Sequence, residues 1–98
     1  MLTFEKRGDG AVVIAGRLDA AQAPAAQQVL DGVAGTVTLD CSRLEYISSA
    51  GLGVLLKTQK RLLKEGGKLR LVAAGRHLCD IFQFSGLDKL FDIERAAE

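Results

Sequence analysis

Residues 40–56 read DCSRLEYISSAGLGVLL, and within them the chain changes from strand to helix. The preceding residues 36–39 are rich in β-branched side chains and alternate with a period of two, which predicts a buried strand. We expect this strand to end at Asp40-Cys41-Ser42, because these residues favour a turn. From Ser49 onward the apolar side chains follow the spacing of one helical face: Leu52, Leu55, Leu56, Leu62 and Leu63. Ser48 or Ser49 is therefore the expected N-cap of a helix.

Two serines and two glycines occupy the predicted helix start. The first turn of a helix has backbone N–H groups without partners and carries the positive end of the helix dipole, so a hydroxyl or an anion is favoured there. Gly51 and Gly53 need an explanation, because Gly costs about 1 kcal/mol relative to Ala inside a helix. Close packing against the strand ends and an open surface for a partner are both open explanations. A dinucleotide fingerprint is disfavoured, since Leu56 stands where the third Gly is required.

Residues 40–55 resemble the signature of the STAS family, the sulfate-transporter and anti-sigma-factor-antagonist domain. The usual form of that signature is D-x-S-x-[LV]-x-[YF]-[IM]-D-S-[ST/A]-G-L-G-x-[LV]. Two further segments are similar to the family: residues 16–19, GRLD, resemble its G-x-[LI]-D element, and residues 81–87, IFQFSGL, resemble its L-F-x-x-[ST]-G-L pattern. The resemblance thus covers nearly the whole chain.

The resemblance implies a set of site residues. In bacterial anti-sigma factor antagonists of the family, a partner kinase phosphorylates the serine that follows the motif's aspartate, which is Ser49 here. The aspartate itself is replaced by Ser48, which is the second candidate acceptor. The family's G-x-[LI]-D aspartate, Asp19 here, contributes to kinase recognition, although a turn or capping role explains such a residue equally well. The implied partner-binding set is Asp19, Ser48, Ser49, Ala50, Gly51, Leu52 and Gly53.

Length and composition favour one globular domain over residues 1–98. Hydrophobic residues make up 48% and charged residues 26%, close to the globular average, which argues against disorder. A net charge of +1 argues against a nucleic-acid partner. The N-terminus lacks a signal-peptide pattern and no apolar run approaches the roughly 18 residues of a membrane span, so we expect a cytoplasmic protein without membrane insertion.

The remaining pattern predicts an α/β fold. A hairpin of residues 2–5 and 11–15 turns at Gly8-Asp9-Gly10, and a helix follows Pro24. The central helix ends at residues 65–68, residues 69–72 form a strand, a third helix closes at residues 85–87, and residues 91–93 form the last strand. The inward positions of the first and third helices are expected to be Ala26, Val29, Leu30, Val33, Leu78, Ile81 and Phe82. We predict a STAS-like single domain with a mixed β-sheet, an N-terminal hairpin followed by parallel crossovers, and helices packed on one face.

The chemistry of the other residues argues against an enzyme. His77 is the only histidine and has no evident partner, so neither a nucleophile–base pair, a metal site nor a cofactor is predicted. Cys41 and Cys79 are expected to be small buried thiols. A basic stripe on the central helix is expected to be solvated: Lys57, Lys60, Arg61 and Lys64. Phe84 is expected to pack under the final strand, with an exposed contact role as the alternative.

The resemblance implies a switch protein that binds and does not catalyse. It would be an anti-sigma factor antagonist in a partner-switching circuit, binding an anti-sigma serine kinase when unphosphorylated and released by phosphorylation at Ser49. A phosphatase would reverse the modification. The alternative is a STAS subunit that docks on a transporter ATPase or a signalling scaffold without being phosphorylated.

Overall fold

The computed structural model describes residues 1–96, which form a five-stranded mixed sheet with three helices. The strands lie in the sheet in sequence order: β1 (Leu2–Lys6), β2 (Val12–Leu18), β3 (Thr36–Ile47), β4 (Lys68–Ala74) and β5 (Asp92–Arg95). β1 and β2 pair antiparallel, and every later neighbour pairs parallel. The helices are α1 (Ala23–Asp31), α2 (Ser49–Lys64) and α3 (Arg76–Ser85), followed by the short 3₁₀ helix η1 (Leu87–Lys89). The predicted fold class is confirmed.

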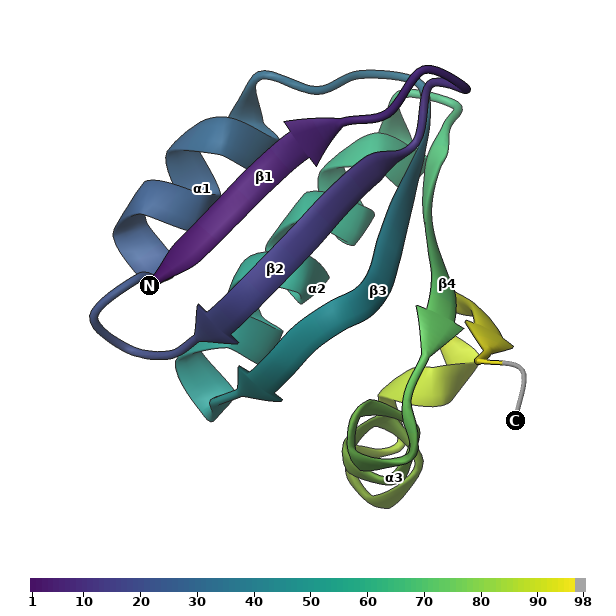
Figure 1. The fold of residues 1–98 in the computed structure, drawn as a ribbon. Coiled ribbons are helices and arrows are strands. Elements are labelled where there is room, and N and C mark those ends of the chain that lie inside the picture. Colours follow the sequence, from purple (N-terminus) through teal and green to yellow (C-terminus); the bar gives the residue numbers. More distant parts are fainter. Residues whose placement is uncertain (97–98) are drawn as a thin grey trace.

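A single hydrophobic core lies between the sheet and the helices. Figure 1 shows α1 and α2 side by side on one face of the sheet, with α3 beyond the end of β4. Leu78 and Phe82 of α3 belong to the same buried cluster as Leu55 and Leu62 of α2. Burial of each such side chain contributes about 1.5–3 kcal/mol relative to an exposed position. The core therefore holds all three helices to one sheet.

β3 is longer than predicted. It continues through Asp40-Cys41-Ser42 to Ile47, so the expected end of the strand was wrong. The register with β2 shifts twice, because extra residues of β3 are inserted opposite β2. In the first shift the Asp40 carboxylate accepts a hydrogen bond of 2.9 Å from the Ser42 N–H, a turn-like contact inside the strand. Such bulges keep the strand running while they increase its twist.

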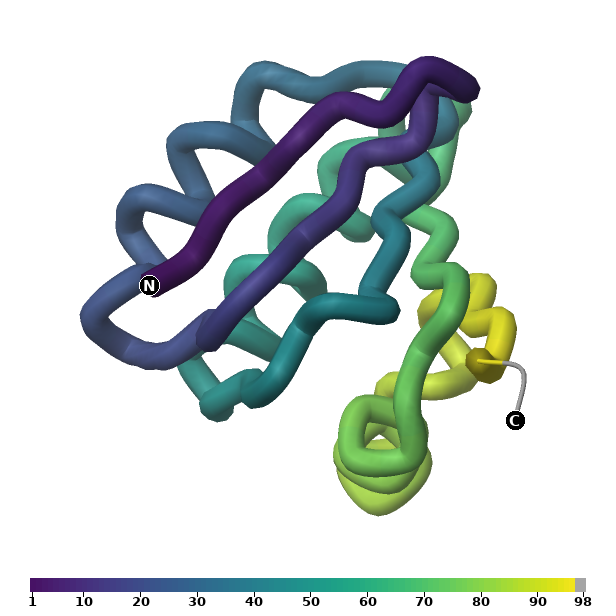
Figure 2. The backbone as a smooth tube through the Cα atoms, in the orientation of Figure 1, coloured from purple at the N-terminus to yellow at the C-terminus, as the bar shows by residue number. Residues whose placement is uncertain are grey.

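The second half of β3 leaves β4. The pairing of these two strands ends at Asp40 and Val72, and β3 continues beside β2 alone. Figure 2 shows β3 turning away from β4 beyond this point. The divergence carries residues 43–47 of β3 to the start of α2, and it leaves room for the first turn of α3 beside them.

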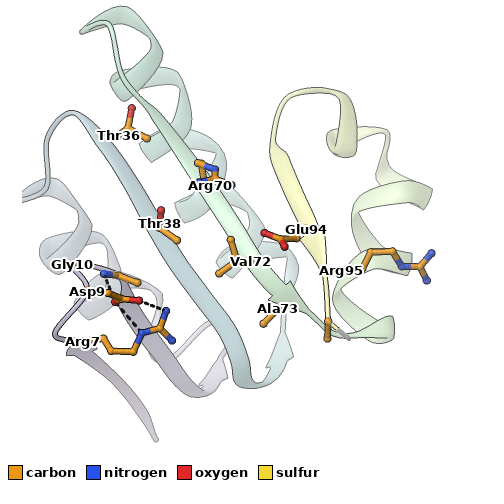
Figure 3. Close-up of a pocket in the computed structure, with 12 residues that line it drawn as sticks. Arg7, Asp9, Gly10, Thr36, Thr38, Arg70, Val72, Ala73, Glu94 and Arg95 are labelled. Atoms are coloured by element: carbon orange, nitrogen blue, oxygen red, sulfur yellow. Dashed lines mark hydrogen bonds and ion pairs between the residues drawn. The ribbon is translucent and has the colours of Figure 1, made fainter. Parts of the chain in front are cut away.

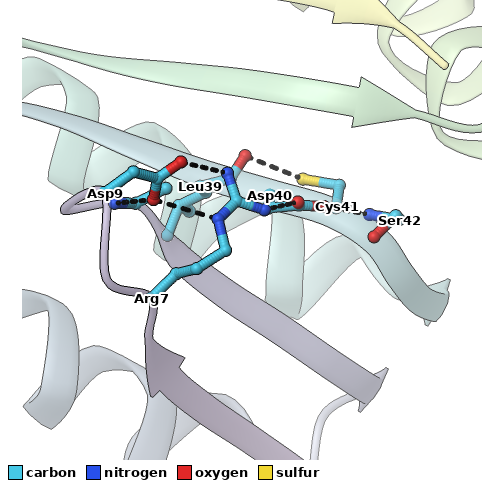
Figure 4. A network of polar contacts seen from close by, with 7 residues as sticks. Arg7, Asp9, Leu39, Asp40, Cys41 and Ser42 are labelled. Carbon is cyan, nitrogen blue, oxygen red and sulfur yellow. Dashed lines mark hydrogen bonds and ion pairs between the residues drawn. The ribbon is translucent and has the colours of Figure 1, made fainter.

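Arg7 ties the N-terminal hairpin to β3. Its guanidinium forms ion pairs with Asp40 and, at 3.0 Å, with Asp9, as Figure 4 shows. The Asp9 carboxylate also accepts a bond of 3.1 Å from the Ala11 N–H, which closes the turn. Hydrogen bonds from Ser42 and Arg7 hold the pKa of Asp40 below its ordinary value. The aspartate that begins the signature thus has a structural role.

Several helix positions differ from the predicted pattern. Val29 and Leu63 are exposed, because the buried side of α1 is narrow and α2 buries Leu62 in preference to its neighbour. Phe84 is 87% exposed, so the expected packing under the final strand was wrong. It lies on the side of α3 opposite Leu78 and Phe82, and α3 turns only that side to the core.

Arg61 departs from the solvated stripe predicted for α2. Its guanidinium donates hydrogen bonds of 2.9 Å to the Leu30 carbonyl and 2.7 Å to the Val33 carbonyl. These carbonyls lie at the end of α1 and beyond it, where a helix leaves acceptors without intrahelical partners. Arg61 therefore joins α2 to α1, whereas Lys57, Lys60 and Lys64 are exposed as expected.

Gln59 is a buried polar residue that sequence analysis missed. Its amide nitrogen donates to the Leu90 carbonyl at 2.6 Å, and its amide oxygen accepts from the Leu69 N–H at 2.6 Å. One side chain therefore joins α2 to the start of β4 and to the segment after η1.

None of the helices within residues 1–96 is long and apolar enough to cross a membrane.

Candidate functional site at the start of α2

The two serines at the end of β3 have different environments. Ser48 is the N-cap of α2: its Oγ accepts a hydrogen bond of 3.2 Å from the Gly51 N–H, and its own N–H donates to the Leu18 carbonyl at 2.9 Å. Ser48 is half-buried. Ser49 is the first residue of the helix and is exposed, and its hydroxyl forms no hydrogen bond within residues 1–96. The site therefore contains one serine engaged in capping and one accessible serine.

The two glycines of the first turn differ in the space around their Cα atoms, so different explanations apply to them. A Cβ on Gly51 would lie 2.6 Å from the Leu18 carbonyl oxygen and 2.9 Å from the Ile47 side chain. Close packing against the strand ends therefore requires glycine at this position. A Cβ on Gly53 would meet nothing within 4 Å, and Gly53 is exposed. Steric packing does not account for Gly53, which lies on an open surface.

The other candidate residues lie around this turn. Ala50 is exposed and Leu52 is half-buried, whereas Gly51 is buried and contributes through packing. The Leu18 carbonyl accepts a hydrogen bond from the Ser48 N–H. Asp19 is the next residue after Leu18, so the fold places it near the two serines although it is far from them in sequence. The Asp19 carboxylate accepts a hydrogen bond of 3.0 Å from the Gln22 N–H, which fits the predicted turn role before α1.

Three side chains beside this turn were missed by sequence analysis. The Arg17 guanidinium carbon lies 4.4 Å from the centroid of the Tyr46 ring, a distance typical of a cation–π contact. The His77 ring stacks near Tyr46 with centroids 6.1 Å apart and an interplanar angle of 20°. Arg17 and Tyr46 are paired residues of β2 and β3, one position before the Leu18–Ile47 pair. We refer to Arg17, Tyr46 and His77 as the aromatic stack.

The two cysteines are free thiols with different degrees of burial. Cys41 is buried, and this burial raises the pKa of its thiol to about 12, so the thiol stays protonated near neutral pH. Cys79 is only half-buried, and its thiol lies 3.5 Å from the Ala74 carbonyl oxygen. The expectation of a buried thiol is thus confirmed for Cys41 alone.

A separate hollow lies on the helix-free face of the sheet. It has a volume of about 700 Å³ and is lined by strand residues such as Thr38 and Val72, as Figure 3 shows. Two of its three arginines are paired: Arg7 contacts Asp9 and Asp40, and Arg70 contacts Asp92 at 3.2 Å. No three potential metal-binding side chains gather anywhere within residues 1–96.

Comparisons of the sequence with known proteins point to one family. The family model described as Mlab, STAS domain, matches residues 2–93. An anti-sigma-B factor antagonist of Bacillus subtilis is 33% identical over 97 residues, which are 96% of this chain and 89% of that relative. BtrV of Bordetella bronchiseptica, a provisionally assigned anti-sigma factor antagonist, is 40% identical over 62 residues. That alignment spans 63% of this chain and about half, 53%, of BtrV.

A solved structure has the same fold. The Bacillus cell fate determinant SpoIIAA, in its phosphorylated form, superposes with a TM-score of 0.69 over 95% of this chain and 90% of its own. The sequence identity is 24%, so this likeness concerns the arrangement of strands and helices.

Proposed function

The chain belongs to the STAS domain family, and on that premise we propose that it is an anti-sigma factor antagonist of a partner-switching circuit. Unphosphorylated, it binds an anti-sigma serine kinase in the cytoplasm through the start of α2. Phosphorylation of Ser49 releases it, and a phosphatase restores binding. The protein therefore acts by binding and is a substrate of its own partner. The exposed hydroxyl of Ser49 is the observation that carries this proposal.

The environment of the two serines favours Ser49 as the acceptor. A kinase must place the acceptor hydroxyl in line with the γ-phosphate, which requires an exposed side chain. The Ser48 hydroxyl is half-buried and caps α2, so its transfer to a kinase site would cost the cap, about 1 kcal/mol. Ser49 carries no such cost. The replacement of the family's aspartate by Ser48 thus preserves the cap and leaves the acceptor free.

A phosphate on Ser49 would act on the interface and spare the fold. It adds about −1.5 to −2 charges at the N-terminus of α2, where the helix dipole favours negative charge. In a docked complex the same phosphate must lose water and face the partner's surface. A loss of about 3 kcal/mol would weaken binding roughly a hundredfold, which suffices for a switch. The phosphorylated form of SpoIIAA, which has the same fold, supports the view that such a domain tolerates the modification.

Phosphate mapping tests the proposal directly. The purified chain is incubated with the anti-sigma serine kinase of the same organism and ATP, and the modified residue is located by mass spectrometry. We expect one phosphate on Ser49 and none on the Ser49→Ala variant. Ser48→Asn is the matched control, because Asn caps a helix as well as Ser but offers no hydroxyl, and it should still be phosphorylated. A phosphate on Ser48, or no modification of the wild-type chain, would contradict the proposal.

The second candidate function follows from Ser48 itself. The family's aspartate supplies a negative charge that this loop lacks, and a loop without that charge suits a fixed docking patch on a transporter ATPase or a signalling scaffold. The same residues, Ala50 and Gly53 among them, would then form the contact. Affinity capture in the presence of nucleotide separates the two functions. A transporter ATPase bound to a chain that stays unphosphorylated would favour this second function.

A further inference from the structure

Within the aromatic stack, Arg17 and Tyr46 lie on the side of the sheet opposite α1 and α2, close to Ser49. Paired residues of neighbouring strands project to the same side, and Leu18 and Ile47 point into the core. Arg17 and Tyr46 precede that pair by one position, so they project to the opposite side. Ser48 and Ser49 follow Ile47 directly, which brings the stack to the border of the proposed phosphorylation site.

Arg17 is a cation without a carboxylate partner. Within residues 1–96 every ion pair of an arginine involves Arg7, Arg61 or Arg70, and Arg17 forms none. Arg43 is also exposed and unpaired, but its strand partner is Ala15, so it lies further along β3 from Ser49 than Tyr46 does. Glu45 is exposed between Arg43 and Tyr46 but makes no ion pair with either arginine. Near Ser49 the sheet thus presents one guanidinium group without an ion pair, that of Arg17.

The stack also fixes the position of Arg17. A guanidinium packed over an aromatic ring has fewer rotamers left to lose when a ligand binds. His77 of α3 stacks near the same ring, so three elements hold the arrangement. Arg and Tyr are, with Trp, the residue types enriched among the energetically dominant contacts of protein interfaces.

We propose that Arg17, held on the ring of Tyr46, binds a carboxylate on an acidic surface of the kinase and anchors the kinase beside Ser49. This inference rests on the proposed function and names the chemistry of its partner. Charge complementarity favours a carboxylate on the partner, because Arg17, beside the proposed phosphorylation site, forms no ion pair within residues 1–96. An acidic surface at this place also explains release, since it would repel a new phosphate on Ser49.

Charge variants of Arg17 test the anchor. Binding of the purified kinase to the unphosphorylated chain is measured by calorimetry with ADP, so that no phosphoryl transfer occurs. We expect Arg17→Ala to bind about tenfold or more weakly, and Arg17→Glu about a hundredfold more weakly, because the reversed charge meets the acidic surface. Lys60→Ala is the matched control, since Lys60 is an exposed cation on α2 away from the stack, and its affinity should equal that of the wild type. Added salt should weaken the wild type more than Arg17→Ala.

Variants of Tyr46 separate the stack from the charge alone. Tyr46→Phe keeps the ring and should bind within about twofold of the wild type, whereas Tyr46→Leu leaves Arg17 unsupported and should approach Arg17→Ala. Thermal unfolding of each variant verifies that the fold is intact. If Arg17→Glu binds as tightly as the wild type while Ser49 is phosphorylated normally, this inference is overturned and the proposed function stands. A kinase that does not bind the wild-type chain at all overturns both.

Discussion

At the scale of single residues, the glycines of the first turn of α2 answer to different constraints, and a pair of substitutions separates them. Gly51→Ala would place a Cβ 2.6 Å from the backbone oxygen of Leu18, which cannot move without disturbing β2, so we expect a loss of about 1–3 kcal/mol in unfolding free energy. Gly53→Ala meets nothing within 4 Å and should gain up to about 1 kcal/mol from helix propensity.

Urea unfolding followed by circular dichroism measures both variants under the same conditions. Equal effects of the two substitutions would contradict the packing explanation for Gly51. Kinase binding gives a second comparison, because Gly53 lies on the open surface near Ser49. If Gly53→Ala is more stable but binds the kinase more weakly, the glycine is retained for contact with the partner.

At the scale of elements, Gln59 joins α2 to β4, and its replacement tests how firmly that helix is held. Gln59→Leu keeps a similar volume but removes both the donor to the Leu90 carbonyl and the acceptor of the Leu69 N–H. Leu69 is buried, so its N–H would lose its partner away from water, at a cost of about 1–3 kcal/mol. We expect a lower urea midpoint with an unchanged slope. Lys60→Leu, one residue along on the exposed side, should leave the midpoint nearly unchanged.

The elements also show how far sequence reasoning reaches. The order of strands and helices follows from local periodicity, and an N-cap at Ser48 or Ser49 follows from capping chemistry, so both could be predicted. The extent of β3 could not, because Asp40-Cys41-Ser42 carry turn-forming residues that a bulge accommodates within the strand. The contact of Arg17 with Tyr46 depends on that unpredicted half of the strand. The role of Gln59 could not be predicted either, because its two backbone partners, Leu69 and Leu90, are distant in sequence.

At the scale of the whole molecule, the proposed switch requires that charge at Ser49 change binding while the fold stays intact. Ser49→Asp tests this separation. An aspartate at the first position of α2 meets the positive end of the helix dipole, so the unfolding free energy should stay the same or rise by about 0.3–1 kcal/mol. Binding to the kinase should weaken about tenfold or more, because the same charge would face the proposed acidic surface in the complex.

The control for charge is Ser49→Asn, which has nearly the same shape as aspartate and no charge. Its kinase affinity should lie close to that of the wild type if repulsion causes release, and close to Ser49→Asp if bulk alone does. Calorimetric binding and urea unfolding on the same preparations keep the two quantities apart. A Ser49→Asp chain that loses stability together with binding would mean that the charge disrupts the start of α2. A chain that keeps both would leave phosphorylation of Ser49 without a regulatory effect.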